Sequence, residues 1–462
     1  MRTTTRKRRI AQGLMLGALA TLALAARGQT SLAWEQTKYF QYNILNVAVA
    51  PATAAGSWTV KVMFSVSNPA AGGVPWDLKT APFQTAPANM TLDIAWAGKE
   101  FTNAGSTGAA LSPISTTALG AGAAMPAQVR GLQGTTTTDV AKSCTSTSDC
   151  PGLTSPQLVG SYWVSRTVTP VPNTVTAGRV AIEGRLVCNE AGLSPSLGCP
   201  TVAPFPTIPV KSATADFEFT ESSTALIANQ RRTIVDIGKC KGCHDDQKHG
   251  DVVVPRLSLH GGNRNENLDL CVVCHNPNQT DVNYRYLSTT DARIGAAETP
   301  IDFKTMVHSI HAGGFRKTPF VVVGFGSSVN DFSDVRFPAE LRKSCLQCHV
   351  VDARGRGSFE LPISATALGT TVRTQSVYQV ANGQPRTIDV KPANDLKITP
   401  TAAACSSCHD NSEVRSHMVR TGGASFGTTQ DKIGVTVKER CANCHGRGKD
   451  KDVRKVHELG SR

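Results

Sequence analysis

Cys240-Lys-Gly-Cys243-His244 is the first of five copies of one pattern, and these copies decide how the C-terminal half of the chain is built. The other copies are Cys271-Val-Val-Cys274-His275, Cys345-Leu-Gln-Cys348-His349, Cys405-Ser-Ser-Cys408-His409 and Cys441-Ala-Asn-Cys444-His445. In each copy two thiols stand three positions apart and a histidine follows directly. No other cysteine occurs after Cys199.

Cys-x-x-Cys-His is the attachment signature of c-type haem. Two thiols at this spacing reach the two vinyl groups of one porphyrin, and the next histidine reaches the iron. We therefore predict five covalently attached haems c, held by the ten motif cysteines and ligated by His244, His275, His349, His409 and His445. Zinc is the alternative, since cysteine pairs also form Cys₄ sites. Five pairs cannot all be matched two by two, and zinc needs no histidine after every pair.

The remaining histidines indicate the class of haem. The chain has 11 histidines. Six lie outside the motifs: His249, His260, His308, His311, His417 and His457. We predict that five of them, His260, His308, His311, His417 and His457, are the second iron ligands and that His249 is the spare. An exchange of His249 with His260, or ligation by Met306 or Met418, is the alternative. Iron with two histidines has no open position for a substrate, which favours electron transfer over catalysis.

Two of these histidines belong to one short predicted helix at residues 302–313. Asp302 is a suitable N-cap and Gly313 can end the helix. His308 and His311 are three residues apart and therefore share one helix face. Because one iron can take only one of them, we expect them to serve two different haems and to hold those haems close together.

Residues 1–26 have the features of an export signal. A basic segment ends at Arg9, an apolar run covers 10–24, and Ala23-Leu24-Ala25 fits a cleavage site. A membrane anchor is the alternative, although the run is shorter than the about 20 residues that a span needs. We therefore predict a signal peptide at 1–26, a β domain at 27–228 and a pentahaem cytochrome domain at 229–462.

The N-terminal half has the alternation of β-strands. In Thr59–Val66 the residues Val60, Val62 and Phe64 fall on one face. Similar runs occupy 91–96, 161–168, 179–187 and 214–219, which predicts an all-β domain, an antiparallel sandwich or split barrel. Residues 102–140 lack periodicity and are expected to form a loop.

The C-terminal domain should have short helices and little regular structure, with a small hairpin within 350–400. In such a domain the porphyrins themselves form the apolar core, which agrees with an aromatic content of only 6%.

Four cysteines in the N-terminal half have no histidine neighbour. In an oxidising compartment they should pair as Cys144–Cys150 and Cys188–Cys199. The net charge of +13 falls to +8 without the five basic residues of the signal. Haem propionates lower it further, so we expect no nucleic-acid partner despite the sequence pI of 9.2.

Several strings resemble the OmcA/MtrC family of outer-surface multihaem c-type cytochromes. They are His260-Gly-Gly-Asn-Arg264, Cys271-Val-Val-Cys-His-Asn-Pro277, Met306-Val-His-Ser-Ile-His-Ala-Gly313 and Ser416-His-Met-Val-Arg-Thr-Gly-Gly423. Members typically carry ten haems in two pentahaem domains, each preceded by a β domain. They pass electrons from an outer-membrane porin–cytochrome conduit to metal oxides, flavins or other external acceptors. This chain has five motifs and resembles one half of that architecture. It has no cysteine for lipid attachment after its signal, which leaves anchoring open.

Together these features predict an exported electron carrier at the outer cell surface or secreted, with the periplasm as the alternative. Its expected partners are other redox proteins, a porin–cytochrome conduit and external electron acceptors. We assign no catalytic residue, and any metal reduction would follow from its role as terminal electron donor. A periplasmic shuttle, a subunit of a conductive filament and a reductase of nitrogen or sulfur oxyanions are the alternatives.

Overall fold

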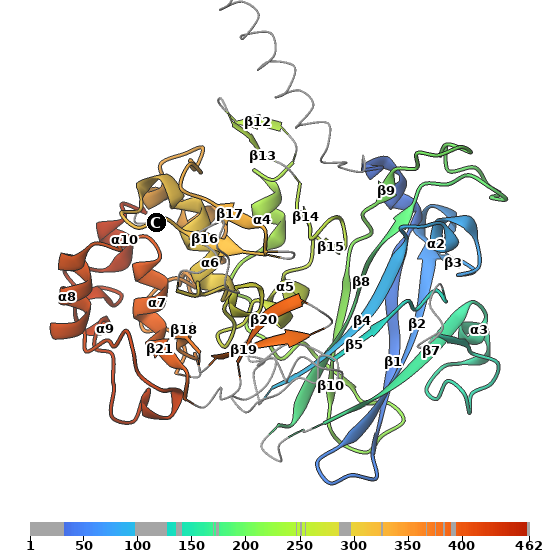
Figure 1. Ribbon diagram of the computed structural model, residues 1–462, viewed down its shortest axis with the longest axis horizontal. Helices are drawn as coiled ribbons and strands as arrows, with labels where there is room; N and C mark the ends of the chain where they lie inside the picture. The colour runs from blue at the N-terminus through green and yellow to red at the C-terminus, as the bar shows by residue number, and fades with distance from the viewer. Residues whose placement is uncertain are drawn as a thin grey trace, which may run out of the picture.

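The computed structural model describes residues 32–459 apart from 98–126, 135–140, 170, 172–174, 246, 250–251, 255, 286–296, 325–326, 366, 375, 382–383 and 390–393. The predicted signal at 1–26 lies outside these residues. Figure 1 shows the β-rich N-terminal half beside a C-terminal half of short helices and hairpins. No helix in the described part of the chain is long and apolar enough to cross a bilayer.

The N-terminal half contains two antiparallel sheets. The first has the strand order β1-β2-β7-β6 with β3 beside β2. Its strands are β1 (Gln41–Pro51), β2 (Trp58–Asn68), β3 (Val74–Pro75), β6 (Lys142–Ser143) and β7 (Ser161–Val168). The second has the order β11-β10-β8-β4-β5 with β9 beside β8. Its strands are β4 (Asn89–Ala97), β5 (Ala127–Arg130), β8 (Ala177–Val187), β9 (Thr207–Ile208), β10 (Ala213–Glu218) and β11 (Leu226–Ile227).

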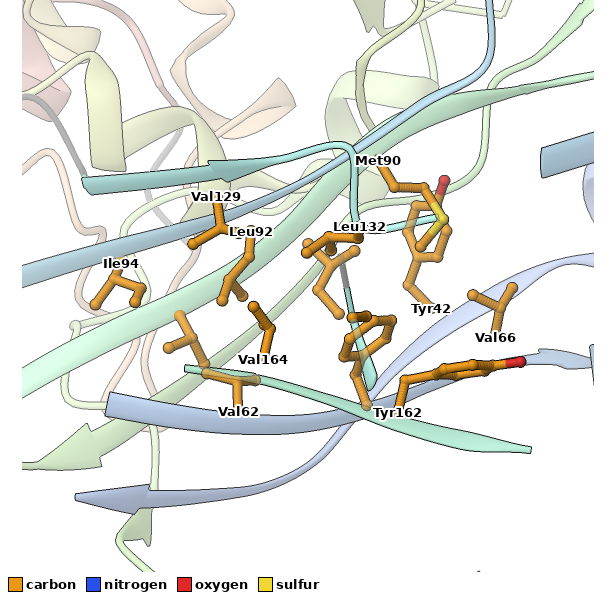
Figure 2. Close-up of a cluster of buried hydrophobic side chains, with 14 of the residues drawn as sticks. Tyr42, Val62, Val66, Met90, Leu92, Ile94, Val129, Leu132, Tyr162 and Val164 are labelled. Carbon is orange, nitrogen blue, oxygen red and sulfur yellow. The ribbon is translucent and has the colours of Figure 1, made fainter. Parts of the chain in front are cut away.

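This arrangement confirms the predicted all-β class as a sandwich, and neither sheet closes into a barrel within the described residues. The alternation in β2 has its expected consequence, because Val60, Val62 and Phe64 are fully buried. They belong to one hydrophobic core with Leu92 and Ile94 of β4. Figure 2 shows Val62 and Val164 of the first sheet facing Leu92 and Ile94 of the second. The predicted loop at 102–140 lies mostly outside the described residues, but β5 corrects it at Ala127–Arg130.

The second sheet is buried on both faces. Leu92 and Ile94 point into the sandwich, and their neighbours Asp93 and Ala95 therefore point away from it. Asp93 is nevertheless only 1% exposed and Ala95 0%. Ala95 packs against Val273 of the C-terminal half. The C-terminal half therefore docks on this outer face. The strand's alternating sequence is the one expected for a sheet with that face in water.

A buried arginine fastens the two halves together. Arg179 of β8 is 1% exposed and pairs with Asp216 of β10 through Nε–Oδ1 at 2.6 Å. Its Nη1 also reaches Oδ1 of Asp269 at 3.2 Å, and Asp269 lies in the helix of the second cysteine motif. The Asn267 side chain donates to Ser212 O at 2.8 Å. The buried guanidinium of Arg179, bound by Asp216 and Asp269, therefore fixes the position of the second motif on the sheet.

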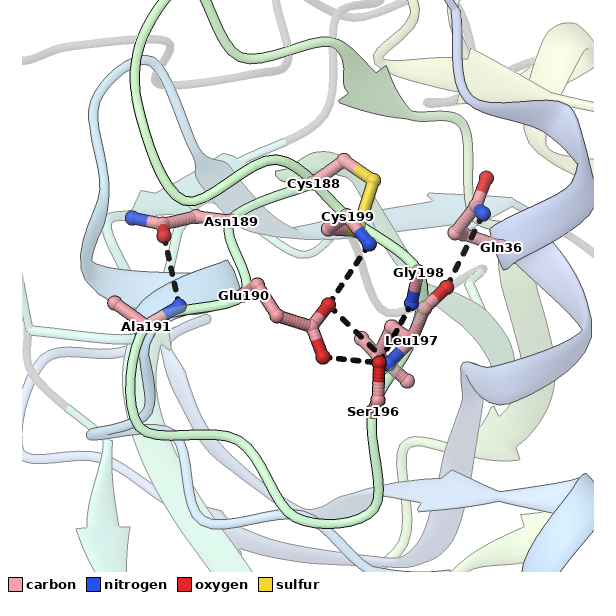
Figure 3. Close-up of a disulfide and its surroundings, with 9 residues drawn as sticks. All are labelled: Gln36, Cys188, Asn189, Glu190, Ala191, Ser196, Leu197, Gly198 and Cys199. Carbon is pink, nitrogen blue, oxygen red and sulfur yellow. Dashed lines mark hydrogen bonds between the residues drawn. A yellow bond between two sulfur atoms is a disulfide. The ribbon is translucent and has the colours of Figure 1, made fainter.

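Both predicted disulfides, Cys144–Cys150 and Cys188–Cys199, are present. Figure 3 shows how Glu190 organises the loop that the second one closes. Its carboxylate accepts the backbone N–H of Leu197 at 2.9 Å and of Cys199 at 2.8 Å. Both disulfides precede the first Cys-x-x-Cys-His motif in the chain, and both stabilise turns of the sandwich.

The C-terminal half has the short elements that were expected. Its α-helices are α4 (Ile237–Lys241), α5 (Leu268–Cys274), α6 (Phe303–His311), α7 (Pro400–Ser406), α8 (Ser412–Arg420), α9 (Ala442–His445) and α10 (Val453–Val456). Two-stranded hairpins join them, among them β14–β15 (Ser258–Leu259, Arg264–Asn265) and β16–β17 (Val321–Val323, Val329–Asp331). Within 350–400 the chain forms the pairs β18–β21 (Thr370–Arg373, Leu396–Ile398) and β19–β20 (Ser376–Ala381, Gln384–Asp389).

Candidate haem-binding sites

Every Cys-x-x-Cys-His motif adopts one helical turn. In each, the backbone N–H of the histidine donates to the carbonyl of the first cysteine, at 2.8–2.9 Å. Positions i, i+3 and i+4 of such a turn lie on one side. Both thiols and the imidazole can therefore face one porphyrin. We number the sites 1–5 in the order of their motifs, from Cys240 to His445.

Each motif histidine lies opposite one histidine from outside the motifs. The ring-centre separations are 6.1 Å for His244–His311, 5.9 Å for His260–His275, 6.0 Å for His308–His349, 6.0 Å for His409–His457 and 6.2 Å for His417–His445. These pairs account for ten of the 11 histidines, and the remaining one is His249.

The separations fit an iron between the rings. A metal–nitrogen bond to histidine is about 2 Å long, and the ring centre lies about 1 Å beyond the nitrogen, so two opposed ligands have ring centres about 6 Å apart. Direct stacking of imidazoles would bring them closer, and unrelated side chains would not repeat the same spacing five times. The residues present therefore fit five haems with two axial histidines each.

Hydrogen bonds to Nδ1 orient several of these rings. In each, Nδ1 lies near an oxygen, which leaves Nε2 for the metal. The bonds are His275 to Ile301 O at 2.9 Å, His311 to Val307 O at 2.8 Å, His349 to Ser358 Oγ at 2.9 Å, His445 to Lys451 O at 2.9 Å and His457 to Arg342 O at 3.1 Å. A carbonyl only accepts, so Nδ1 carries the proton in those pairs. Sequence reasoning missed these acceptors because they are mostly backbone carbonyls.

Helix α6 supplies histidines to two sites. His308 lies opposite His349 of site 3, and His311 lies opposite His244 of site 1. The helix begins after Asp302, but the Asp302 side chain does not cap it. That carboxylate instead accepts Thr370 Oγ1 and binds Lys304. The Nδ1 atom of His308 is buried with no hydrogen-bond partner within the described residues.

Burial keeps the imidazoles in the form that binds metal. It lowers the pKa of His260 to about 3, where the nearby Arg264 adds to the effect. It also lowers the pKa of His308 and His349 to about 4. A neutral imidazole is the ligating species, so sites 2 and 3 are prepared to hold a metal across the physiological pH range.

The thiols of sites 1 and 3 lie beside each other. Cys240 of site 1 is hydrogen bonded to Cys348 of site 3. The second thiol of site 1, Cys243, is also close to Cys348, because burial and then the charge of Cys348 raise the pKa of Cys243. Both predicted attachment cysteines of site 1 therefore face the motif of site 3.

Sites 4 and 5 continue this series in space. Cys345 of site 3 lies near enough to act on the pKa of Cys408 in site 4. In the same way Cys441 of site 5 acts on the pKa of Cys405 in site 4. Cys444 of site 5 is the exposed member of the ten motif thiols. Sites 1, 3, 4 and 5 are thus neighbours in that order.

Site 2 lies against the sandwich. Cys274 packs with Val273 and Ala95, and the loop after His260 is held by Gly184 N–H, which donates to Asn263 O at 2.8 Å. Arg264 of β15 binds Glu183 of β8, with Nη2 donating to Oε1 at 2.7 Å. No sequence pattern indicated this pair, because Glu183 lies in a strand on the alternating outer face.

The zinc alternative needs ligands gathered around one point. Within the described residues, no group of three or more His, Cys, Asp or Glu side chains is arranged to hold a metal ion. The histidines instead form opposed pairs, and one member of each pair belongs to a Cys-x-x-Cys-His motif. This is the donor set of a porphyrin iron rather than of a tetrahedral ion.

Comparison with known proteins gives the following. Residues 232–458 match the sequence model described as outer membrane cytochrome MtrC/MtrF-like, domains II/IV. The curated proteins contain no match. Among solved structures, the crystal structure of the outer membrane decaheme cytochrome OmcA aligns with 91% of this chain at 18% identity and a TM-score of 0.40. The alignment covers 48% of that chain, so this chain spans about half its length.

Proposed function

Because residues 232–458 belong to the MtrC/MtrF-like family of outer membrane cytochromes, we propose that this chain carries electrons through five covalently attached bis-histidine haems. The repeated spacing of 5.9–6.2 Å between opposed histidines is the observation that carries the proposal. The proposed second ligands are His260, His308, His311, His417 and His457. The motif cysteines, from Cys240 and Cys243 to Cys441 and Cys444, would form the thioethers.

Two axial imidazoles per site would leave no position for a substrate. The haem supplies one-electron exchange when bound. Two histidines would hold each iron, and backbone carbonyls that accept from Nδ1 fix the tautomers of His275, His311, His445 and His457. This arrangement favours an electron carrier over an oxyanion reductase, which requires an open ligand position.

The contacts between motifs support a relay within the chain. Sites 1 and 3 share helix α6, and the sulfur atoms of Cys240 and Cys348 lie close enough for a hydrogen bond between the free thiols. Both are properties of one packed unit, so an electron would pass between these sites without domain movement. The neighbouring contacts of sites 4 and 5 extend the relay away from the sandwich.

The family is one of the outer membrane, in agreement with the predicted outer cell surface. There the chain would take electrons from another redox protein, such as a porin–cytochrome conduit, and deliver them to external acceptors including metal oxides. Any metal-reducing activity would come from this terminal donation. Protease treatment of intact cells followed by haem staining should remove the band, and a protected band would place the protein in the periplasm instead.

Spectroscopy and mass measurement test the haem count and ligation. The mass of the purified protein should exceed that of its polypeptide by five haems. Electron paramagnetic resonance of the oxidised protein should show low-spin iron throughout, with near-infrared magnetic circular dichroism typical of two histidines. A high-spin signal or a different haem count would contradict the proposal.

A further inference from the structure

Two buried carboxyl groups lie on the sheet face that site 2 covers. Asp93 of β4 is 1% exposed and Glu183 of β8 is 3% exposed. In the pairing of these strands Thr91 opposes Glu183 and Ala181 opposes Asp93. Asp93 and Glu183 are therefore diagonal neighbours on one face, within reach of each other's charge.

The two acids share few partners. Glu183 binds Arg264, whose Nε lies 2.6 Å from Oε2 and whose Nη2 donates to Oε1 at 2.7 Å. Asp93 Oδ1 accepts Gln128 Nε2 at 2.8 Å. Asp93 Oδ2 is buried with no hydrogen-bond partner in the part of the chain that the structure describes. Arg264 is the cation in direct contact with the pair, and Arg130 acts on both acids from a greater distance. Two buried carboxylates with one direct ion pair favour a proton on one of them.

Site 2 lies directly beside this pair. Ala95 shares its strand face with Asp93 and packs against Val273 and Cys274 of the haem-attachment helix α5. On the other side, the hairpin that follows His260 carries Arg264 onto Glu183. The pKa of the Cys274 thiol responds, after burial, to Asp93, Arg264 and Glu183. Charge at site 2 and charge on the pair therefore act on each other.

The charged and titratable groups around the pair come from several elements. Arg264 faces Glu183 from β15, and Arg130 faces both acids from β5. Tyr42 of β1 lies on the core side of the sheet, where burial and then the charge of Glu183 raise its pKa. Burial and then the charge of Asp93 raise the pKa of Glu183 to about 8, against the lowering effect of Arg264 and Arg130. Burial also raises the pKa of Asp93.

We propose that the Asp93–Glu183 pair is a proton-binding site coupled to site 2, an inference that rests on the proposed haem there. An electron that reaches site 2 would add one negative charge beside the pair. The Glu183 carboxylate then takes one proton from solvent and becomes a carboxylic acid. Reoxidation of site 2 releases that proton. The Arg264 side chain, which is 25% exposed, provides the edge through which water reaches Glu183.

The sign of the coupling follows from the pair's proton affinity. Added negative charge raises the pKa of Glu183 above its starting value of about 8. Reduction is then accompanied by proton uptake at and above that pH, so the reduction potential falls as pH rises. Below it the pair is already protonated in both redox states, and this site contributes no pH dependence.

Redox titration with infrared detection tests the proposal on the haem-loaded protein. Glu183→Gln and Asp93→Asn are compared with wild type above and below about pH 8. We expect wild type to show a carboxylic-acid C=O band in the reduced-minus-oxidised spectrum above this pH, and a potential that falls with pH. Glu183→Gln should lose the band and that part of the pH dependence. Asp93→Asn should weaken both, because it removes the charge that raises the pKa of Glu183.

Glu218→Gln, an exposed carboxyl on β10 of the same sheet, is the matched control and should leave both signals unchanged. The proposal would be overturned if the C=O band and the pH dependence of the potential persisted in both Glu183→Gln and Asp93→Asn. Loss of these two signals in the control would also overturn it. Haem content and low-spin spectra measured on every variant separate this outcome from failure of the proposed function. If site 2 held no haem, wild type itself would lack the fifth low-spin centre.

Discussion

Each site joins a motif histidine to a histidine at a different sequence distance. His260 precedes its partner His275 closely, whereas His311 lies far downstream of His244. At sites 4 and 5 the pairs are nested, because His417 and His445 form one pair within the span from His409 to His457. The histidines that counting proposed as second ligands are the ones that lie opposite the motif histidines. Counting could not predict the partners, since nested pairs depend on how α7 to α10 pack.

Replacing the two histidines of α6 should affect two different haems. His308→Ala is expected to open the iron of site 3 and His311→Ala that of site 1, each giving one high-spin, carbon-monoxide-binding haem in five. The double variant should give two. The measurement is the high-spin signal in electron paramagnetic resonance, scaled to total haem.

His249→Ala is the matched control for these variants. It removes the histidine that no pair requires, so all haems should stay low-spin. A high-spin haem in this variant, or only one in the double variant of α6, would show that the assignment of second ligands is wrong.

At the scale of elements, β4 and β8 explain why the docking face escaped prediction. Their alternation places polar and small residues opposite the sandwich core, which is the pattern of a sheet face in water. Arg179, Asp93 and Glu183 would then be ordinary surface residues. In the structure they are covered by α5 and β15, and Arg179 and Glu183 form ion pairs across the domain boundary. Sequence periodicity shows which face a residue takes but not what covers that face.

The buried arginine of β8 should matter more to stability than an exposed one. Arg179→Leu leaves Asp216 buried without its cation, which should cost about 3–5 kcal/mol in the free energy of unfolding. Arg342 pairs on the surface with Glu340 and Glu458, and Arg342→Ala should change stability little. Denaturant unfolding followed by circular dichroism compares the two. Equal losses of unfolding free energy in the two variants would show that Arg179 does not stabilise the contact between the two halves.

At the scale of the whole molecule, the two halves are stabilised by different means. The sandwich has one large apolar core drawn from both sheets. The apolar clusters in the described C-terminal half are small, such as Ala402, Met418 and Ala424. The low aromatic content of the sequence, 6%, and the five motifs predict that porphyrins form the core of this half.

Removing the haems should therefore unfold one half only. In a variant with all ten motif cysteines changed to serine, residues 229–459 should be digested rapidly by protease, while a fragment of the sandwich persists. The haem-loaded protein should resist digestion in both halves. Mass spectrometry of the fragments identifies the surviving segment. Loss of the sandwich at the same rate as the C-terminal half would contradict separate stabilisation.

The unequal exposure of the motif cysteines bears on where an electron would enter or leave the proposed relay. At site 2 the sheet and helix α5 cover Cys274. At site 5 Cys444 is exposed. Electron tunnelling weakens steeply with separation, so a redox partner exchanges charge fastest where the cofactor edge is least shielded. With haems bound as proposed, a redox partner or an external acceptor would therefore exchange electrons at site 5 rather than at site 2.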